Sequence, residues 1–342
     1  MTTQTLPAVE HFRSSTGVEI YRIPAEAFPG FWAYAYLLIG AGVPTLVDTG
    51  SGYPASTEGI LAGLASVTAD FDPAFRLQDI ARIIITHGHV DHFGGLVDLL
   101  EAVGGADVGI HPLDRRVLTN YDERVIVATR NLTIYLKSAG IQGEALTALL
   151  QSYGFSKQHI RSSKVDFVVE DGDEIDGMQF VHVPGHCSGQ VAIRLGDVLL
   201  SADHVLSYTA PNVAAESITH YTGLGHYRDS LRKVQALDGI RLAMGGHEDP
   251  IEHFYERIDR IQARIDQKLG RILTIIRNSE APMSITDICD VLYATKQGFE
   301  RLLALQQTGA YTEYLYDRGH LSVANLQAIE QSEQATVLYN VL

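Results

Sequence analysis

Cysteine, basic residues and long apolar runs are all scarce in this chain of 342 residues. Its only two cysteines, Cys187 and Cys289, lie far apart in the sequence, which excludes a disulfide framework of the kind found in small secreted proteins. No run of about 20 uninterrupted apolar residues occurs, so we expect no membrane-spanning helix. The first ten residues lack the basic and apolar segments of a signal peptide. These absences predict a cytoplasmic protein with no membrane partner.

Acidic residues outnumber basic ones, 41 against 26, and the net charge is −15. A strongly acidic protein repels a phosphate backbone unless a local basic patch compensates. The densest basic stretch, residues 257–277, also carries Asp259 and Asp266 at helical spacing and is typical of a solvated helix face. The charge therefore disfavours nucleic acid as a partner and favours a small-molecule substrate.

The chain is rich, by contrast, in possible metal ligands that follow apolar runs. Residues 83–85 (III) precede the segment 86–92 (THGHVDH), which places three imidazoles and one carboxylate within six residues. Neutral imidazole and carboxylate suit zinc, and also iron or manganese. A surface loop that binds metal only adventitiously is the alternative interpretation. Three further clusters downstream argue against it: PGH at 184–186, SADH at 201–204 and GGH at 245–247.

Each downstream cluster also follows a short strand-like run, which predicts ligands gathered at one edge of a sheet sandwich. The order HxHxDH, His, Asp, His resembles the metallo-β-lactamase superfamily, and so does the segment LVDTG at 46–50. The resemblance covers roughly residues 17–260 and implies an α/β fold, the αββα sandwich, with two metal ions. It assigns the ligands as follows: His87, His89 and His186 to the first metal, Asp91, His92 and His247 to the second, and Asp203 as the bridge between them.

Seven ligands are too many for one tetrahedral zinc but suit two ions that share a water. We therefore expect two zinc ions, with iron or manganese as the alternatives. The resemblance further implies that Asp48 orients the ligand loop, whereas the other interpretation is a turn aspartate before Gly50. His204 has no ligand role in the family pattern. Cys187, beside His186, is expected to be a small filler residue rather than a softer ligand or a redox-sensitive thiol.

An inserted segment, residues 112–163, shows helical periodicity and no strand signal. Strands are expected around it at 18–23, 33–39, 44–47 and 108–110, and helices at 54–67 and 93–103. The insertion is apolar and aromatic, with Tyr121, Tyr135 and Tyr153. It is interpreted either as a lid over an apolar substrate or as a helical layer that packs for stability or dimerisation.

The chain is divided into a catalytic domain, residues 1–265, and a small C-terminal domain, residues 266–342. An amphipathic helix is expected from 251 to 265, followed by helices from 268, from 284 and over 296–307, and by a turn- and β-prone stretch at 309–323. This order resembles the winged-helix-like domain of β-lactamase-like protein 2. Six basic against eight acidic residues over 268–342 leave a charge of −2, which favours packing or homodimer formation over DNA binding.

The resemblance implies a hydrolase in which a hydroxide that bridges the metals attacks a carbonyl carbon, and the metals stabilise the oxyanion. The expected substrate is a thioester, ester or lactone of a small molecule, and Asp91 would shuttle the proton. Segments 203–212 and 223–231 resemble the branch of glyoxalase II and β-lactamase-like protein 2, in which Tyr227 or His226 would donate to the oxyanion or contact the substrate. A capping and packing role of this segment is the alternative.

The alternative function is an endoribonuclease or phosphodiesterase that acts on RNA, as in relatives of β-lactamase-like protein 2, because two metals suit attack on phosphorus equally well. The acidic charge and the apolar insertion weigh against it. A binding module would be expected to lose ligands, and a β-lactamase proper belongs in a secreted protein. Oxygen-dependent chemistry of iron is compatible with the ligands, although no flavodoxin domain follows.

Overall fold

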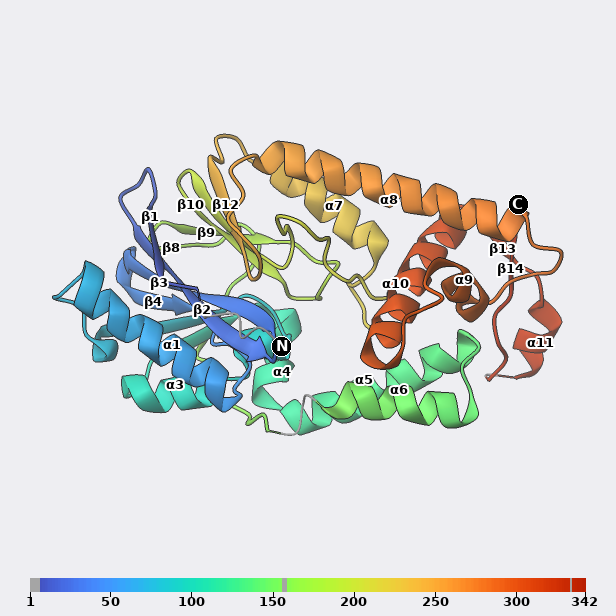
Figure 1. Cartoon of the computed structure of the whole chain (residues 1–342), viewed down its shortest axis with the longest axis horizontal. Helices are drawn as coiled ribbons and strands as arrows, with labels where there is room; N and C mark the ends of the chain where they lie inside the picture. Colours follow the sequence, from blue (N-terminus) through green and yellow to red (C-terminus); the bar gives the residue numbers. More distant parts are fainter. Residues whose placement is uncertain (1–6, 156–158, 333) are drawn as a thin grey trace.

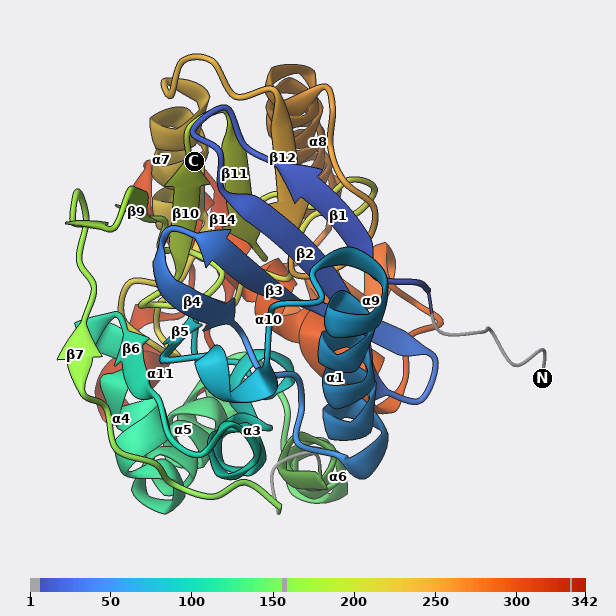
Figure 2. The ribbon, with the colours of Figure 1, turned by 90° about the vertical axis from the view of Figure 1, so that its left-hand side faces the viewer.

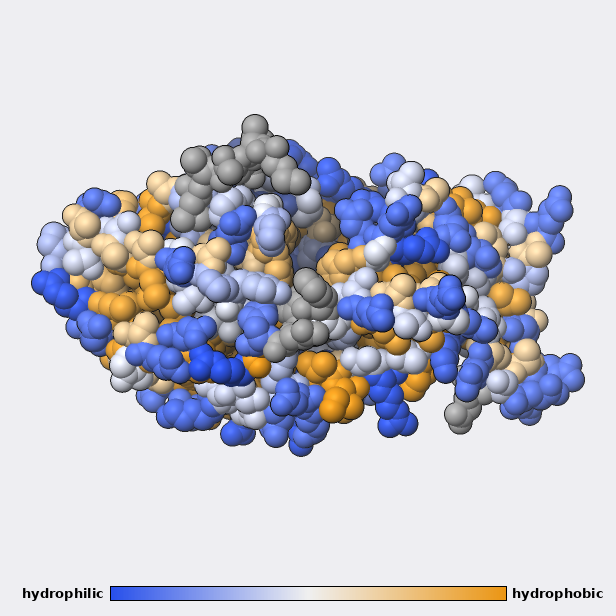
Figure 3. Space-filling model, turned by 60° about the horizontal axis from the view of Figure 1, so that its bottom comes forward, coloured by the Kyte–Doolittle hydropathy of each residue, from blue (hydrophilic) through white to orange (hydrophobic). Residues whose placement is uncertain are grey.

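The computed structural model describes residues 7–155, 159–332 and 334–342. Within them, two mixed β-sheets pack face to face, and helices cover both outer faces (Figures 1 and 2). This is the αββα sandwich that the sequence predicts. The helices α5, α6 and α9 to α11 form a helical half of the molecule beside the sandwich (Figure 1), and the face seen in Figure 3 is hollowed between the two halves.

The first sheet has, among the described residues, seven strands in sequence order, of which β1 to β4 are antiparallel and β4 to β7 parallel. The helices α1 (Pro54–Ser66) and α3 (Leu96–Val103) cover its outer face. The strands are β1 (Glu10–Arg13), β2 (Glu19–Phe28), β3 (Phe31–Gly40), β4 (Gly42–Val47), β5 (Arg82–Ile85), β6 (Asp107–Ile110) and β7 (Phe167–Val168). The strands predicted at 18–23, 33–39, 44–47 and 108–110 are confirmed, as is the helix at 54–67.

The second sheet has the strand order β12-β11-β10-β9-β8. Its outer face is covered by α7 (Leu224–Gln235) and by the first half of α8 (Phe254–Arg277) (Figure 1). The strands are β8 (Glu174–Ile175), β9 (Met178–His182), β10 (Val191–Leu195), β11 (Val198–Ala202) and β12 (Leu242–Gly245). No helix in the described part of the chain is long and apolar enough to cross a bilayer.

Strand β3 shows how the sequence builds these layers. Successive side chains of a strand point to opposite faces of the sheet. Tyr36 and Leu38 lie in the core between the two sheets, whereas Ala35 and Leu37 lie in the core that includes Ile60 of α1. Both faces of β3 are therefore buried, which explains why its sequence is apolar almost without interruption.

The strand directions bring the candidate ligands to one edge of the sandwich. Strand β10 is antiparallel to both β9 and β11, and β12 is parallel to β11, so β9, β11 and β12 all end at the same edge. In the first sheet β4 and β5 are parallel and also end together. The four ligand-bearing segments follow the ends of β5, β9, β11 and β12 directly, and Asp48 follows the end of β4. Their convergence is thus a consequence of topology rather than of any single loop.

The helix expected at 93–103 is interrupted at its start. Residues Val90–Phe93 form the short helix α2, and α3 begins only at Leu96. Between them, a Cβ atom on Gly94 would collide with the carbonyl of Ser51, and one on Gly95 with the carbonyl of Thr49. Two glycines in succession therefore let the ligand loop lie directly against the turn that follows β4.

The insertion is helical, as predicted, and consists of α4 (Arg115–Thr119), α5 (Tyr121–Ser138) and α6 (Gly143–Phe155), while residues 156–158 lie outside the described part. One face of α5, with Leu132, Tyr135 and Leu136, is buried in the same core as Leu302 and Leu305 of α10. The Tyr135 hydroxyl donates a hydrogen bond of 2.7 Å to the Leu305 carbonyl. These contacts support the packing role of the insertion, and the lid role stays a prediction.

Two expectations for the C-terminal region are wrong. The helix that begins near residue 251 does not end at 265, because α8 continues without a break to Arg277. The stretch 309–317 is not β-prone, because α10 (Gly298–Asp317) runs through it and places Ala310, Tyr311 and Leu315 in the core. Burial of these side chains at helical spacing overrides the strand propensity of tyrosine.

The remaining elements of this region are α9 (Ile285–Leu292), β13 (Leu321–Val323), α11 (Leu326–Gln331) and β14 (Tyr339–Val341), and β13 pairs with β14 in a small antiparallel sheet. Helix α9 starts at the predicted cap, where the Ser284 hydroxyl accepts a hydrogen bond from the Asp287 amide. A strand is present at the end of the predicted 309–323 stretch, but its partner β14 follows α11 and was not expected from the sequence. The winged-helix assignment and the division at 265/266 stay predictions.

The contact between the insertion and α10 can be tested at Gly309. A Cβ atom there would overlap the Tyr135 hydroxyl, so Gly309→Ala is expected to lower the free energy of unfolding by about 1–3 kcal/mol. Gly270→Ala is the matched control, because this α8 glycine is exposed and a methyl group added to it would meet no atom within 4 Å; it should raise stability by about 0.5–1 kcal/mol. Urea unfolding of both variants measures the difference, and equal stabilities would contradict the packing described.

Candidate metal centre

The seven histidines and aspartates that the sequence proposes as ligands lie together at the common edge of the two sheets. Their possible ligand atoms form three overlapping groups, in each of which all atoms lie within 4.8 Å of one another. The groups are His87, His89 and His186; His87, His92 and Asp203; and Asp91, His92 and His247. The first and third groups match the two sets of terminal ligands that the sequence resemblance implies.

Three of the histidine rings are fixed from outside by oxygen atoms. In each ring Nδ1 donates to the oxygen, which leaves Nε2 as the nitrogen that faces inward and that would bind a metal in its deprotonated form. The acceptors are Asp48 Oδ2 at 2.8 Å from His92, the Asn212 carbonyl at 2.6 Å from His186 and the Trp32 carbonyl at 2.6 Å from His247. This is the arrangement that holds imidazole in the tautomer and orientation required of a metal ligand.

Asp203 occupies the middle of the inward-facing nitrogens. Its Oδ2 atom lies 3.5 Å from His186 Nε2 and 3.3 Å from His247 Nε2, and its Oδ1 atom lies 3.4 Å from His92 Nε2. Asp91 adds a second carboxylate, whose Oδ2 atom is 3.3 Å from His247 Nε2. A carboxylate in contact with nitrogens of both terminal groups has the position expected of a bridging ligand.

The buried atoms of the cluster fit a bound cation. His92 Nε2, His186 Nε2 and Asp203 Oδ1 are buried and lack a hydrogen-bond partner among the described residues. Leaving one buried polar atom unpaired costs about 1–3 kcal/mol, and three at one point would be a large defect in an otherwise well-packed edge. Divalent ions bound by these lone pairs would satisfy all three atoms.

The pKa values of the site differ between the group of His89 and the group of His247. Burial and the neighbouring His186 ring lower the pKa of His89 to about 3, so this imidazole is neutral. Burial alone would lower the pKa of His247, but the Asp203 and Asp91 carboxylates raise it to about 10. Burial would raise the pKa of Asp203, yet the surrounding imidazoles hold it well below its usual value. Two ionised carboxylates therefore stand ready to neutralise positive charge.

Asp48 lies outside the three groups and holds the ligand loop. Its Oδ1 atom accepts the Thr86 amide at 2.7 Å, and its Oδ2 atom accepts the Thr86 hydroxyl at 2.8 Å in addition to the His92 ring. The structure thus places Asp48 where the loop-orienting role requires it. Asp48 has a φ of 63°, and Ala202 and Glu248, which adjoin Asp203 and His247, have φ of 46° and 63°. Left-handed backbone at non-glycine residues is strained and is typical of functional sites.

Cys187 belongs to none of the three groups that the described residues form. Its thiol donates to Asp114 Oδ2, 3.2 Å away. Burial and the Asp114 charge raise the pKa of the thiol well above its usual value, so it stays protonated and is a poor ligand or redox centre. The geometry agrees with a small structural residue, with the addition of a hydrogen bond that the sequence did not suggest.

Tyr227 and His226 also lie outside the groups formed by the described residues. The buried Tyr227 hydroxyl donates to the His204 carbonyl at 3.0 Å, and its backbone packs so closely on Gly185 that a Cβ there would lie 2.5 Å from Tyr227 Cα. His226 Nε2 lies 3.0 Å from Glu216 Oε1 near the surface. These contacts support the capping and packing role of the segment, and a catalytic role for Tyr227 or His226 stays a prediction. His204 is likewise outside the ligand groups, and burial lowers its pKa to about 3.

Asn212 and Trp32 were not foreseen from the sequence. Both act through their backbone carbonyls, which every residue carries, so no sequence pattern distinguishes them. Asn212 lies in the loop after the strand end that bears Asp203, and Trp32 belongs to the other sheet. Only the folded chain shows that these carbonyls meet His186 and His247.

Comparison with known families decides the relationship. The profile of the metallo-beta-lactamase superfamily matches residues 29–247, which include every candidate ligand. The chain belongs to this superfamily. Among curated proteins it is 23% identical over 297 residues to the probable metallo-hydrolase YqjP of Bacillus subtilis (strain 168), covering 82% of this chain and 86% of that protein. It is 26% identical over 276 residues to a beta-lactamase-like protein 2 homolog of Caenorhabditis elegans, covering 79% and 74%.

Solved structures show the same fold over almost the whole chain. A metallo-beta-lactamase family protein from Thermus thermophilus aligns with a TM-score of 0.73 and 25% identity, covering 94% of this chain and 98% of that one. A beta-lactamase domain protein from Burkholderia ambifaria aligns with a TM-score of 0.74 and 19% identity, covering 99% and 97%. The likeness therefore includes the helical half of the molecule as well as the superfamily domain.

The bridging position of Asp203 yields a test by metal analysis. Asp203→Ala is expected to reduce bound metal from two ions per chain to one or fewer and to abolish turnover, because both groups lose a shared ligand. Asp70→Ala, which changes an exposed carboxylate in the segment after α1, is the control and should keep both ions. Elemental analysis after dialysis measures the content, and one ion per chain in the wild type together with full activity of Asp203→Ala would overturn the assignment.

Proposed function

We propose that this protein is a dinuclear metal-dependent hydrolase that cleaves a thioester, ester or lactone of a small molecule. The observation that carries the proposal is the convergence of seven imidazole and carboxylate groups, with the Asp203 carboxylate among the nitrogens of three of the rings. The name of the Bacillus subtilis relative, probable metallo-hydrolase, supports the reaction class. The nitrogen-rich ligand set suits zinc first, and also iron or manganese.

The reaction joins a water oxygen to the carbonyl carbon and breaks the bond from that carbon to sulfur or oxygen. When bound, two divalent ions lower the pKa of water and stabilise the negative charge that develops on the carbonyl oxygen. The chain supplies the fixed geometry: Asp48 and the carbonyls of Asn212 and Trp32 keep the three rings in place. Holding these groups in position before the reaction avoids the cost of reorganising them in the transition state.

Asp91 is the group that we assign to proton transfer. Its side chain is 16% exposed against 8% for Asp203, so it is the more accessible of the two carboxylates. Burial would raise the pKa of Asp91, but the His92 and His247 rings hold it below its usual value, so it is ionised and able to accept a proton at Oδ2. Passing this proton to the departing thiolate or alkoxide completes the hydrolysis.

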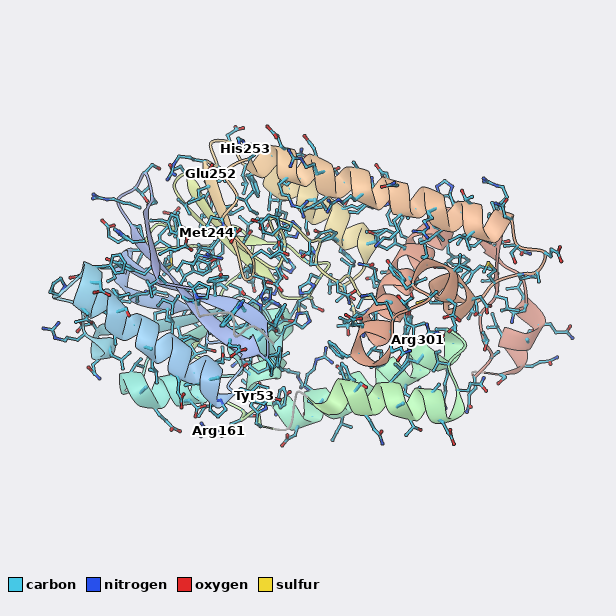
Figure 4. All side chains as sticks on the ribbon, in the orientation of Figure 1. Tyr53, Arg161, Met244, Glu252, His253 and Arg301 are labelled. Carbon is cyan, nitrogen blue, oxygen red and sulfur yellow. The ribbon has the colours of Figure 1, made fainter. Side chains whose placement is uncertain are left out.

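An aromatic row beside the site supports a substrate with an apolar part. The centroid of the Phe31 ring lies 4.5 Å from that of the His247 ring. The Phe28 ring lies between Phe31 and Tyr53, with centroid distances of 6.3 Å and 5.8 Å. Tyr53, labelled in Figure 4 at the start of α1, in turn lies 4.1 Å from the His159 ring. Phe31 is 44% exposed next to a candidate ligand. An exposed aromatic ring at this point offers apolar contact to an acyl chain or ring.

The decisive experiment is a substrate panel of acyl-CoA and acyl-glutathione thioesters, lactones and aryl esters, with zinc-, manganese- and iron-loaded protein. The proposal expects kcat/KM of about 10⁴ M⁻¹s⁻¹ or above on at least one carbonyl substrate. A structured and a single-stranded RNA complete the panel. Cleavage of RNA with negligible rates on every carbonyl substrate would replace the proposal by the phosphodiesterase alternative, against the net charge of −15.

Phe31→Ala tests the contact with the apolar part of the substrate. Removing the ring is expected to lower kcat/KM on the best long-chain or aromatic substrate about fivefold, mainly through KM, because about 1 kcal/mol of apolar contact is lost. The effect should shrink on an acetyl analogue. Phe71→Ala is the matched control, since Phe71 is 41% exposed and packs against Tyr21 and His11 instead. Equal losses on short and long acyl groups would argue against the assigned contact.

A further inference from the structure

A buried carboxylate outside the candidate ligands joins two of the ligand loops. Asp114 closes the short 3₁₀ helix Pro112–Asp114 that follows β6. Its Oδ2 atom accepts the Gly88 amide at 2.8 Å and the Cys187 thiol at 3.2 Å, and its Oδ1 atom accepts the Gly189 amide at 3.1 Å. Gly88 lies between His87 and His89, whereas Cys187 and Gly189 lie just after His186.

The position of Asp114 in the chain suggests a different role from the one that it has. It stands at the N-cap of α4, where an aspartate ordinarily accepts hydrogen bonds from the first turn of its helix. Among the described residues, the Asp114 carboxylate makes no such bond to α4. Both of its oxygens are used instead for loops from the two different sheets. Helix α4 therefore lacks a side-chain cap, and the carboxylate accepts hydrogen bonds from both ligand loops instead.

The loops approach Asp114 so closely that each needs a glycine. A Cβ atom on Gly189 would lie 2.7 Å from Asp114 Cγ, and one on Gly88 would lie 2.9 Å from Val117 Cγ2 and 3.3 Å from Asp114 Cγ. Contacts under 3.0 Å force a neighbour to move. The carboxylate is thus enclosed between the loops, and its position and theirs fix one another.

We propose that Asp114 is a positioning residue that clamps the His87–His89 loop to the His186 loop and thereby sets the geometry of the first metal group. The ligands of that group, His87, His89 and His186, come from two sheets, and Asp114 is in hydrogen-bond contact with both of the loops that carry them. The side chains of the other group, Asp91, His92 and His247, make no hydrogen bond to Asp114 among the described residues. The inference rests on the metal binding proposed above and is independent of the substrate.

The clamp depends on a carboxylate and not merely on a side chain of the same size. A carboxylate accepts from both loops at once, since each oxygen has free lone pairs. In Asp114→Asn one oxygen becomes an amide nitrogen, which faces the N–H of one loop as a second donor. The substitution keeps the volume and removes one of the two loop attachments. Loss of such a supporting partner typically costs about 10- to 100-fold in metal affinity.

The test is a titration of the metal-free wild type and variants with Co²⁺, followed by absorbance and calorimetry. For Asp114→Asn, one of the two binding events is expected to weaken about 10- to 100-fold while the other changes less than about threefold. The absorption bands of the weakened site should also change, because its ligand geometry is altered. Asp197→Asn is the matched control: Asp197 also joins distant segments, through the Ser15 amide and Arg241, but at the opposite end of β11. It should leave both events unchanged.

Thermal unfolding separates positioning from general stability. A merely structural Asp114 would lower the melting temperature of the metal-free protein and leave the increase on metal addition intact, and this result would overturn the clamp. Positioning predicts a smaller increase on metal addition, because the stabilisation by a bound ligand falls with the logarithm of its affinity. Gly189→Ala provides a second variant if Asp114→Asn fails to fold, since it pushes on the carboxylate from the other loop and should weaken the same event.

The wild-type titration keeps the two proposals apart. Binding of two ions by the wild type with unchanged affinities in Asp114→Asn and Gly189→Ala would overturn the clamp and leave the metal centre standing. Equal weakening of both events would also contradict it, because the second group would then depend on Asp114 as much as the first. Absence of any binding by the wild type would overturn the metal centre and the clamp together.

Discussion

The constraint on which the site depends is the burial of an ionised carboxylate among imidazole nitrogens. Asp203 lies within 3.5 Å of the inward nitrogens of His92, His186 and His247, and part of this group has no hydrogen-bond partner among the described residues. Burying polar atoms in this way is costly unless another group satisfies them. The edge of the sandwich is therefore built for cations, and the loops around it are shaped by the need to hold lone pairs in one small volume.

Four oxygen-bearing groups around the ligands accept hydrogen bonds from the histidine rings or from the loops that carry them. Two are backbone carbonyls, of Asn212 and Trp32, and two are carboxylates, of Asp48 and Asp114. Backbone carbonyls are fixed by the sheets and the packed loops around them, so they orient His186 and His247 without side-chain freedom. The carboxylates act where two segments must be joined: Asp48 joins the end of β4 to the ligand loop, and Asp114 joins ligand loops of both sheets. Strained backbone at Asp48, Ala202 and Glu248 accompanies this arrangement.

The sequence predicts ligands at one edge of a sheet sandwich because the strand-like runs and the residues that follow them are local in the chain, whereas the set of seven ligands comes from the resemblance to the superfamily. Runs rich in apolar residues mark β2 and β3, and the histidines and aspartates stand directly after the strands that carry them. It does not predict what depends on distant contacts. The tyrosines of 311–316 favour a strand by local propensity, whereas the helix α10 depends on the burial of Ala310, Tyr311 and Leu315 in a core shared with α5 and α6. The sequence likewise gives no sign of the role of Asp114, since the loops that use its carboxylate are distant in sequence.

The contacts of the insertion bear on whether it is a lid or a layer. Besides the Tyr135–Leu305 hydrogen bond, the Ala139 carbonyl accepts from the amide and hydroxyl of Thr286, and the Ser138 carbonyl accepts from the Val337 amide. Moving α5 away from the C-terminal region would break these bonds and expose side chains such as Leu132 and Leu136, each worth about 1.5–3 kcal/mol when buried. A hinge motion that moved the insertion alone would therefore cost several kcal/mol of lost burial and hydrogen bonding. The contacts favour an insertion that is fixed to the C-terminal helices as one layer, so that any movement of α5 would have to carry both.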